Sequence, residues 1–262
     1  MRLFLFAVIP ALFSVSLVCA GTGNPSEPND STKQITVYSG SVGFTNNGFS
    51  IIPSFSLNSP AVVSILSWRK NKFSVGPDLR LTPGLSRGGM LLWFRYYPIE
   101  KKRFTFRIGT HPALNFQARD ITVNGNTSTI SQMRRFIAWE LNPNFIIGKK
   151  WSAGIYYLQG NGLQLNGPRR SHFVTLNTTL SRIELSRSIR LTLIAAVYYL
   201  NLDRNEGTYL TSTAILRHLR SSFSLESSIN ETFKSNLPNN KEFMWNVTLN
   251  YNFRKVFRRQ MY

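Results

Sequence analysis

The feature that most constrains this chain is an alternation of apolar and polar residues with a period of two. It is clearest from Phe243 to Phe253, where every second residue is apolar and the residues between are polar apart from Met244. The apolar series is Phe243, Trp245, Val247, Leu249, Tyr251 and Phe253. Because successive side chains of a β-strand point to opposite faces, this pattern predicts a strand with one apolar and one polar face.

Similar segments, some apolar on both faces, follow one another through most of the chain and predict an all-β fold. Twelve strands are expected. They are 48–57, 61–69, 73–82, 89–98, 103–111, 132–147, 150–159, 171–184, 188–201, 208–217, 221–231 and 242–253. No helix is expected after the first twenty residues, and no repeat of the solenoid or propeller kind is present.

The first twenty residues, 1–20, predict a signal peptide for export. Arg2 precedes an apolar run, and Ala20 supplies the small residue before a cleavage site. The only cysteine, Cys19, lies in this segment, so the mature chain is expected to hold neither a disulfide nor a cysteine-ligated zinc. After Ala20 no stretch approaches the roughly 18 apolar residues of a spanning helix.

The lengths of the connections distinguish a soluble sandwich from a membrane barrel. After the first connection, 58–60, short and long connections alternate along the chain. Outer-membrane barrels keep short turns on the periplasmic side and longer loops outside, whereas a sandwich has no reason to do so. We therefore predict an antiparallel up-and-down transmembrane β-barrel of about 12 strands over 48–253, with both barrel ends in the periplasm.

Two segments are expected to lie outside this barrel. Residues 21–47 are predicted to form an N-terminal linker and extended segment, because a thirteenth strand at Ile35–Phe44 would break the even strand count. Residues 254–262 are predicted to form a basic periplasmic tail.

The stretch from about Phe49 to Phe253 resembles a small Bacteroidetes-type outer-membrane β-barrel protein. The resemblance lies in GGMLLWFRYYPIEKKRFTFRIGTHPALNF (88–116), ELNPNFIIGKKW (140–151) and WNVTLNYNF (245–253). It implies insertion by the barrel assembly machinery, for which the last strand ends in an aromatic residue, here Phe253, with apolar residues two and four positions earlier. Nine residues follow Phe253, whereas many such barrels stop at the aromatic residue.

The positive charge gathers where the short turns are expected. The chain has 31 Lys plus Arg against 12 Asp plus Glu, a formal charge of +19. Prominent members of this periplasmic basic collar are Lys70, Lys72, Lys101, Lys102, Lys149, Lys150, Arg254 and Lys255. The collar is expected either to hold lipid head groups of the outer membrane or simply to keep the turns solvated. No nucleic-acid-binding module accompanies the charge, so a nucleic-acid partner is not expected.

Charged residues within the strands are expected to line the lumen. Exposing a cation to lipid at mid-membrane costs roughly 2–4 kcal/mol, so these side chains should point inward. They are Asp78, Arg80, Arg107, Glu140 and Glu226. Such a set can line a narrow anion-preferring passage, or it can brace a plugged lumen through arginine–carboxylate pairs.

The catalytic inventory is small. The chain has three histidines, His111, His172 and His218, and none has a serine two residues later, as outer-membrane phospholipase does. No catalytic residue, metal site or cofactor is predicted, and an enzyme is the less favoured reading. The leading function is a passive small-solute pore or structural barrel in the cell outer membrane. The alternatives are a lipid-modifying barrel enzyme, such as an acyl hydrolase, and a periplasmic lipocalin-like carrier.

Overall fold

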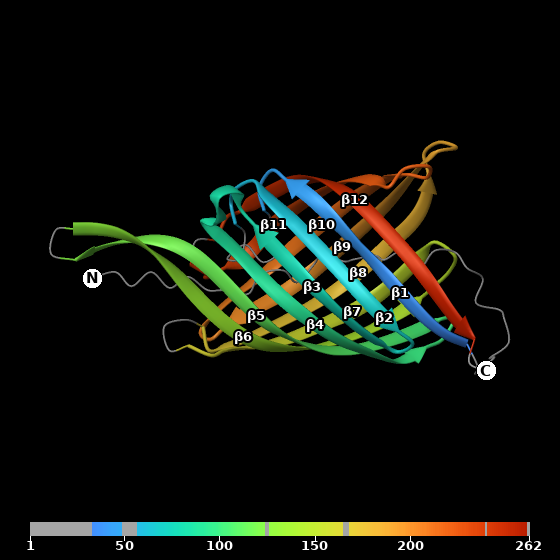
Figure 1. The fold of residues 1–262 in the computed structure, drawn as a ribbon, viewed down its shortest axis with the longest axis horizontal. Helices are drawn as coiled ribbons and strands as arrows, with labels where there is room; N and C mark the ends of the chain where they lie inside the picture. The colour runs from blue at the N-terminus through green and yellow to red at the C-terminus, as the bar shows by residue number, and fades with distance from the viewer. Residues whose placement is uncertain (1–32, 49–56, 124–125, 165–167, 239, 261–262) are drawn as a thin grey trace.

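A computed structural model describes residues 33–48, 57–123, 126–164, 168–238 and 240–260. In these residues twelve antiparallel strands form one closed barrel, in which each strand pairs with its neighbours in the chain and β1 pairs with β12 (Figure 1). The strands are β1 (Lys33–Thr45), β2 (Ala61–Lys70), β3 (Phe73–Leu81), β4 (Arg87–Glu100), β5 (Phe104–Val123), β6 (Asn126–Ile146), β7 (Trp151–Gly162), β8 (Arg170–Glu184), β9 (Ile189–Leu202), β10 (Asn205–His218), β11 (Phe223–Ser235) and β12 (Phe243–Gln260). A short 3-10 helix, η2 (Pro83–Leu85), lies between β3 and β4. Among the described residues, no helix has the length and hydropathy required of a membrane span.

The prediction of a closed antiparallel barrel of about twelve strands is confirmed, but its first strand was assigned to the wrong segment. Ile35–Phe44, predicted to lie outside the barrel, belongs to β1, which pairs with β2 on one side and β12 on the other. The predicted strand 48–57 falls mostly outside the described residues, and Leu57 is not in a strand. With β1 placed at 33–45, the first connection becomes 46–60, a long one, which removes the exception at the first connection. The alternation is broken elsewhere, because only two residues connect β5 to β6 and β9 to β10.

The C-terminal residues are also part of the barrel wall. Residues Arg254–Gln260, predicted to form a tail, continue β12 and pair with β1 as far as Lys33 opposite Gln260. This correction and the previous one have one cause, since the early residues of β1 supply the pairing partner that the end of β12 needs. A strand cannot be extended by its own sequence pattern alone when its partner is more than 200 residues away.

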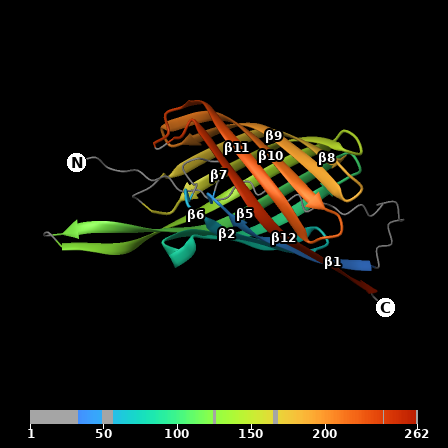
Figure 2. The ribbon, with the colours of Figure 1, turned by 90° about the horizontal axis from the view of Figure 1, so that it is seen from above.

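The predicted long loop 112–131 is largely a β-ribbon. Strands β5 and β6 stay paired as far as Val123 opposite Asn126, well past the ends of their other neighbours, β4 and β7. Figures 1 and 2 show this hairpin projecting beyond the barrel. A second predicted loop, 202–207, is only a two-residue turn between β9 and β10.

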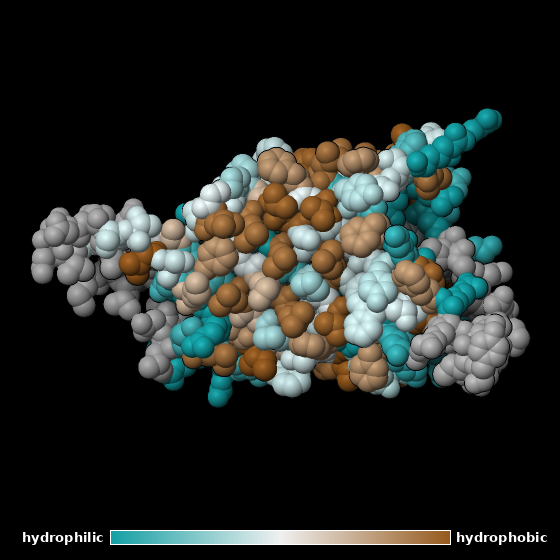
Figure 3. Space-filling view, viewed as in Figure 1, coloured by the Kyte–Doolittle hydropathy of each residue, from teal (hydrophilic) through white to brown (hydrophobic). Residues whose placement is uncertain are grey.

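The two faces of the strands separate as the alternation predicts. In β12, Trp245 and Leu249 are each 52% exposed on the outside, whereas Asn246 and Thr248 between them are buried on the lumen side. Apolar residues cover much of the middle of the outer surface, with hydrophilic residues gathered toward the ends (Figure 3). An apolar outer band over an inner face that carries polar residues is the arrangement of a barrel whose wall contacts hydrocarbon.

Candidate functional site in the barrel lumen

The predicted lumen residues lie on the inner face of the wall. Asp78 and Arg80 on β3 are buried and paired, with Arg80 Nε 3.3 Å from Asp78 Oδ1. Arg107 on β5 and Glu140 on β6 belong to a second cluster, and Glu226 on β11 lies on another part of the wall. Arg80 interacts electrostatically with Glu226, four strands away around the barrel. The inward direction follows from alternation, because Ser74 and Gly76 on β3 are buried with Asp78 and Arg80.

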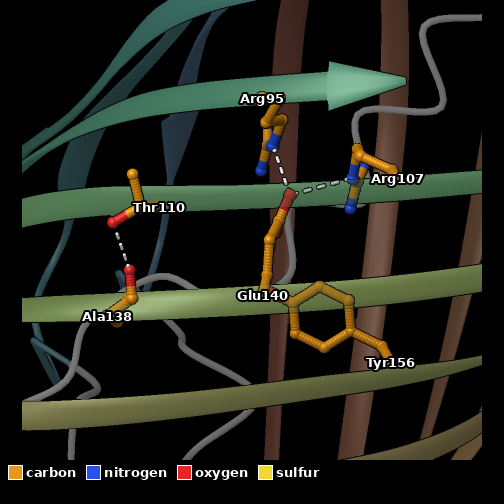
Figure 4. A network of polar contacts seen from close by, with 6 residues as sticks. All are labelled: Arg95, Arg107, Thr110, Ala138, Glu140 and Tyr156. Carbon is orange, nitrogen blue, oxygen red and sulfur yellow. Dashed lines mark hydrogen bonds and ion pairs between the residues drawn. The ribbon is translucent and has the colours of Figure 1, made fainter. Parts of the chain in front are cut away.

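The clearest polar network of the lumen centres on Glu140 (Figure 4). Its Oε1 atom accepts a hydrogen bond from Arg95 Nε at 2.8 Å and lies 2.9 Å from Arg107 Nε. Its Oε2 atom accepts a hydrogen bond from the Tyr156 hydroxyl at 2.9 Å. The four residues come from four consecutive strands, β4 to β7, so the network braces the wall across three strand pairs.

Burial is uneven within this network. The Glu140 side chain is fully buried, whereas Arg95 and Arg107 are 23% and 25% exposed. The Arg95 guanidinium also lies 3.9 Å above the centre of the Trp93 ring, a favourable cation–π distance. Because a guanidinium has five N–H donors, both arginines keep donor capacity beyond their contacts with Glu140. Two cations share one carboxylate, so this section of the wall presents a net positive charge.

Gly109 makes the network possible. In the strand register Gly109 lies directly between Arg95 on β4 and Glu140 on β6. Its missing side chain lets the ion pair cross β5, because a methyl group at this position would lie 2.9 Å from Glu140 Oε1 and 2.9 Å from the Phe94 carbonyl oxygen. Those separations are shorter than real side chains tolerate, so a larger residue must displace the carboxylate or the backbone.

We expect Gly109→Ala to lower the free energy of unfolding by about 1–3 kcal/mol, the usual cost of overpacking a close-packed site. Urea titration of the folded barrel in detergent micelles measures this change. Gly148→Ala is the control, because a methyl group there has no atom within 4 Å, and the change should stay within about 0.5 kcal/mol. Equal stability of the two variants would contradict the role assigned to Gly109.

A cavity lies on the other side of the lumen, over β8 to β11. It is lined by Phe173, Thr175, Tyr198, Thr211, Thr213 and Glu226, among others. Its wall is therefore mixed, with hydroxyl groups and one carboxylate next to aromatic rings. Asn250 Nδ2 lies 3.5 Å from Glu226 Oε2, at the limit of a hydrogen bond.

Aromatic rings form a band along the same wall, toward the end with the longer loops. Tyr156, Phe173, Tyr198 and Tyr209 come from the consecutive strands β7 to β10, with ring centres 6.2, 5.1 and 4.8 Å apart in that order. They belong to a cluster of buried apolar side chains. It also includes Leu91, Trp93, Ala113, Phe136, Ala138, Leu158, Leu200, Leu202, Leu237 and Met244. This cluster narrows the interior, which favours a constricted lumen over a wide channel.

Sequence reasoning missed two members of the Glu140 network, Arg95 and Tyr156. Arg95 lies in a stretch that looks apolar on both faces, and in the structure Leu91 and Trp93 point inward with it. One signal was available, because Arg95 is the one charged residue between Met90 and Tyr97 and a charge inside a strand should avoid lipid. Tyr156 had no such signal, since tyrosine is common on both faces of barrel strands.

The three histidines occupy three different environments. His111 is fully buried in the lumen, with its ring centre 4.0 Å from that of Trp93. His172 lies on the outward face of β8, where Nδ1 is 2.9 Å from the Tyr157 hydroxyl. His218 is exposed where β10 ends. The contacts of His111 and His172 involve aromatic residues, and the structure brings no two of the three histidines to one place.

The predicted basic collar lies at one end of the barrel. The short turns 71–72, 101–103, 147–150, 185–188 and 219–222 share that end with Lys33 and Gln260, because consecutive strands are antiparallel. Lys70 ends β2, and Lys72, Lys101, Lys102, Lys149 and Lys150 lie in turns. Arg254 and Lys255 are exposed residues of β12. The structure therefore brings the eight residues to one rim.

Known structures share this architecture. The KdgM porin matches with a TM-score of 0.50 at 10% identity, over 82% of this chain and 99% of the porin. The chain has the fold of an outer-membrane β-barrel. The COG4313 outer membrane channel from Pseudomonas putida F1 matches with a TM-score of 0.47 at 13% identity, over 88% of this chain and 99% of the channel. No protein-family model matches the chain, and no curated protein sequence does.

Proposed function

We propose that this outer-membrane β-barrel is a passive pore of small bore, with a preference for anions. The observation that carries the proposal is the pairing of two partly exposed arginines, Arg95 and Arg107, with a single buried carboxylate, Glu140. Such a group leaves guanidinium donors and a net positive charge facing the lumen, where the low-dielectric wall strengthens their attraction for an anion.

We propose that the barrel lies in the outer membrane of a Gram-negative cell. The fold of porin and channel structures and the apolar outer band support this location. The export signal at 1–20, the likeness to Bacteroidetes-type barrels and insertion by the barrel assembly machinery stay predictions. Under this topology the short-turn rim with the basic collar faces the periplasm.

A structural barrel with a closed lumen is the second candidate. The observation that favours it is the cluster of buried apolar side chains around Tyr198 and Tyr209, since packed rings obstruct the movement of hydrated ions. Arginine–carboxylate pairs such as Arg80–Asp78 would then serve as braces alone.

Planar-bilayer recordings distinguish the two candidates. We expect the purified barrel to give small, steady current steps and, in a KCl gradient, a reversal potential that shows chloride passing more readily than potassium. Arg107→Gln removes one lumen cation but leaves the Arg95–Glu140 pair intact, so the chloride-to-potassium permeability ratio should fall by about two- to fivefold. Lys149→Gln in an exposed turn is the matched control and should change the ratio little.

The outcomes are distinct. A barrel that runs as a folded, heat-modifiable band on a gel but passes no current would refute the pore and support the structural barrel. Current that is unaffected by Arg107→Gln would refute the role of the Glu140 network in selectivity.

A further inference from the structure

We propose that a groove on the outer surface of the barrel, at its short-turn end, binds the head group of one anionic glycerophospholipid. The groove has a volume of about 440 Å³ and is lined mainly by Trp68, Lys70, Lys72, Phe73, Val75 and Tyr96 of β2, β3, β4 and the turn between β2 and β3. That volume is within the range of roughly 300–1,000 Å³ typical of small-ligand sites. The inference rests on the membrane placement given under the proposed function, but not on conduction.

The hairpin of β2 and β3 builds the groove. Its turn consists of Asn71 and Lys72, with Asn71 in the left-handed region at φ 50°. The register places Lys70 opposite Phe73 and Phe73 opposite Tyr96, and directly opposed residues of paired strands share a face. The rings of Phe73 and Tyr96 pack with centres 4.6 Å apart, and Phe73 is still 64% exposed. The hairpin thus presents aromatic surface outward, where the wall faces the membrane.

The cations of the groove lie at its edge. Lys70 and Lys72 are exposed, and Lys72 Nζ donates one hydrogen bond to the Pro98 carbonyl at 3.2 Å. An ammonium group has three donors, so two remain for a ligand. The nearby carboxylate of Glu100 is 2.5 Å from Arg69 Nη2 and is neutralised by it. The lining residues include no acid, so the groove is complementary to a phosphate group.

The aromatic part of the groove selects a lipid over a free phosphate. Trp68 and Val75 are directly paired outward residues that lead from the lysines toward the middle of the barrel wall. Tryptophan and tyrosine favour the membrane interface, because one part of the ring system is apolar and the other can hydrogen-bond to water. A ligand with a phosphate at the rim and acyl chains along the apolar wall satisfies both parts of the groove at once.

Native mass spectrometry of the detergent-purified barrel tests the proposal, with phosphatidylglycerol and phosphatidylcholine of equal chain length as probes. We expect one phosphatidylglycerol to be retained more tightly than phosphatidylcholine. The double substitution Lys70→Gln, Lys72→Gln should weaken phosphatidylglycerol binding by roughly 25-fold, because each basic residue near an anionic lipid contributes about fivefold. The matched control, Lys149→Gln with Lys150→Gln, removes two lysines of the same rim outside the groove and should weaken binding less than about twofold.

Three results would overturn the proposal. They are equal binding of the two lipids, equal losses in the two double variants, and binding of soluble glycerol 3-phosphate as tight as that of phosphatidylglycerol. The gel shift on heating shows whether each variant is folded. Conductance of the same preparations is recorded separately, so that a failure of lipid binding and a failure of the pore are told apart.

Discussion

Val197→Arg is expected to lower the free energy of unfolding in a phospholipid bilayer by about 2–4 kcal/mol. Val197 lies near the middle of β9 on the outward face, directly between Leu176 on β8 and Leu210 on β10. An arginine there has to displace hydrocarbon or bend toward the interface, because the wall offers apolar neighbours on both sides. Equilibrium unfolding by guanidinium in lipid vesicles, followed by tryptophan fluorescence, measures the change.

Ile189→Arg is the control for this substitution. Ile189 lies on the outward face of the same strand, but at its first residue, next to the turn 185–188. The penalty for a cation falls to roughly 0–1 kcal/mol near the interface. Equal penalties at the two positions, or a Val197→Arg variant as stable as the original chain, would show that this face does not contact hydrocarbon.

Glu140→Ala is expected to destabilise the barrel by about 3 kcal/mol, through a different mechanism. The carboxylate is fully buried and holds Arg95, Arg107 and Tyr156 in place. Its removal leaves two neighbouring guanidinium groups in the lumen without their counter-ion, and breaking a buried ion pair from one side costs roughly 3–5 kcal/mol. The lower value applies here because both arginines retain access to solvent.

Urea titration in micelles measures this loss, and Glu242→Ala serves as its control. Glu242 is an exposed residue of the connection before β12, and its substitution should change stability by less than about 0.5 kcal/mol. A Glu140→Ala variant within 0.5 kcal/mol of the original chain would show that the network contributes little to the fold. Glu140→Gln distinguishes the loss of the negative charge from the loss of the side chain, since the amide can still accept the Tyr156 hydrogen bond.

The strands and their inward and outward faces were predictable where one face is apolar and the other polar. In β3 and β12 the alternation identified the lumen residues Asp78 and Arg80, and the outward residues Trp245 and Leu249. The short turns were predictable as well, because charged and small residues separate the strands there. The alternation carries this information because each residue of a strand must choose between hydrocarbon and an enclosed polar interior.

Strand pairing across the closure of the barrel was not predictable in the same way. β1 alternates as well, with the exposed Val42 and Phe44 on either side of the buried Gly43, but it was left out of the barrel because a thirteenth strand would have broken the even count. Only its pairing with β2 and β12 places it in the wall. The same reason explains why β12 continues to Gln260, since its partner β1 lies more than 200 residues earlier in the chain. The ribbon of β5 and β6 differs, because these two strands are consecutive in the chain and pair with each other. The backbone N–H and C=O groups along the edge of a strand bond to whichever strand lies beside it. The sequence of one strand does not show which strand that is.

The sequence alone therefore determined the fold class, the side of the wall on which each strongly patterned residue lies, and the gathering of basic residues at one rim. The tertiary structure decided which residues meet. Arg95 reaches Glu140 across Gly109, and Lys70 joins Phe73 and Tyr96 in one groove, only because of the register of neighbouring strands. The physical reason is that the face to which a side chain points is fixed by a local period of two, whereas the register is fixed by how two separate strands pair.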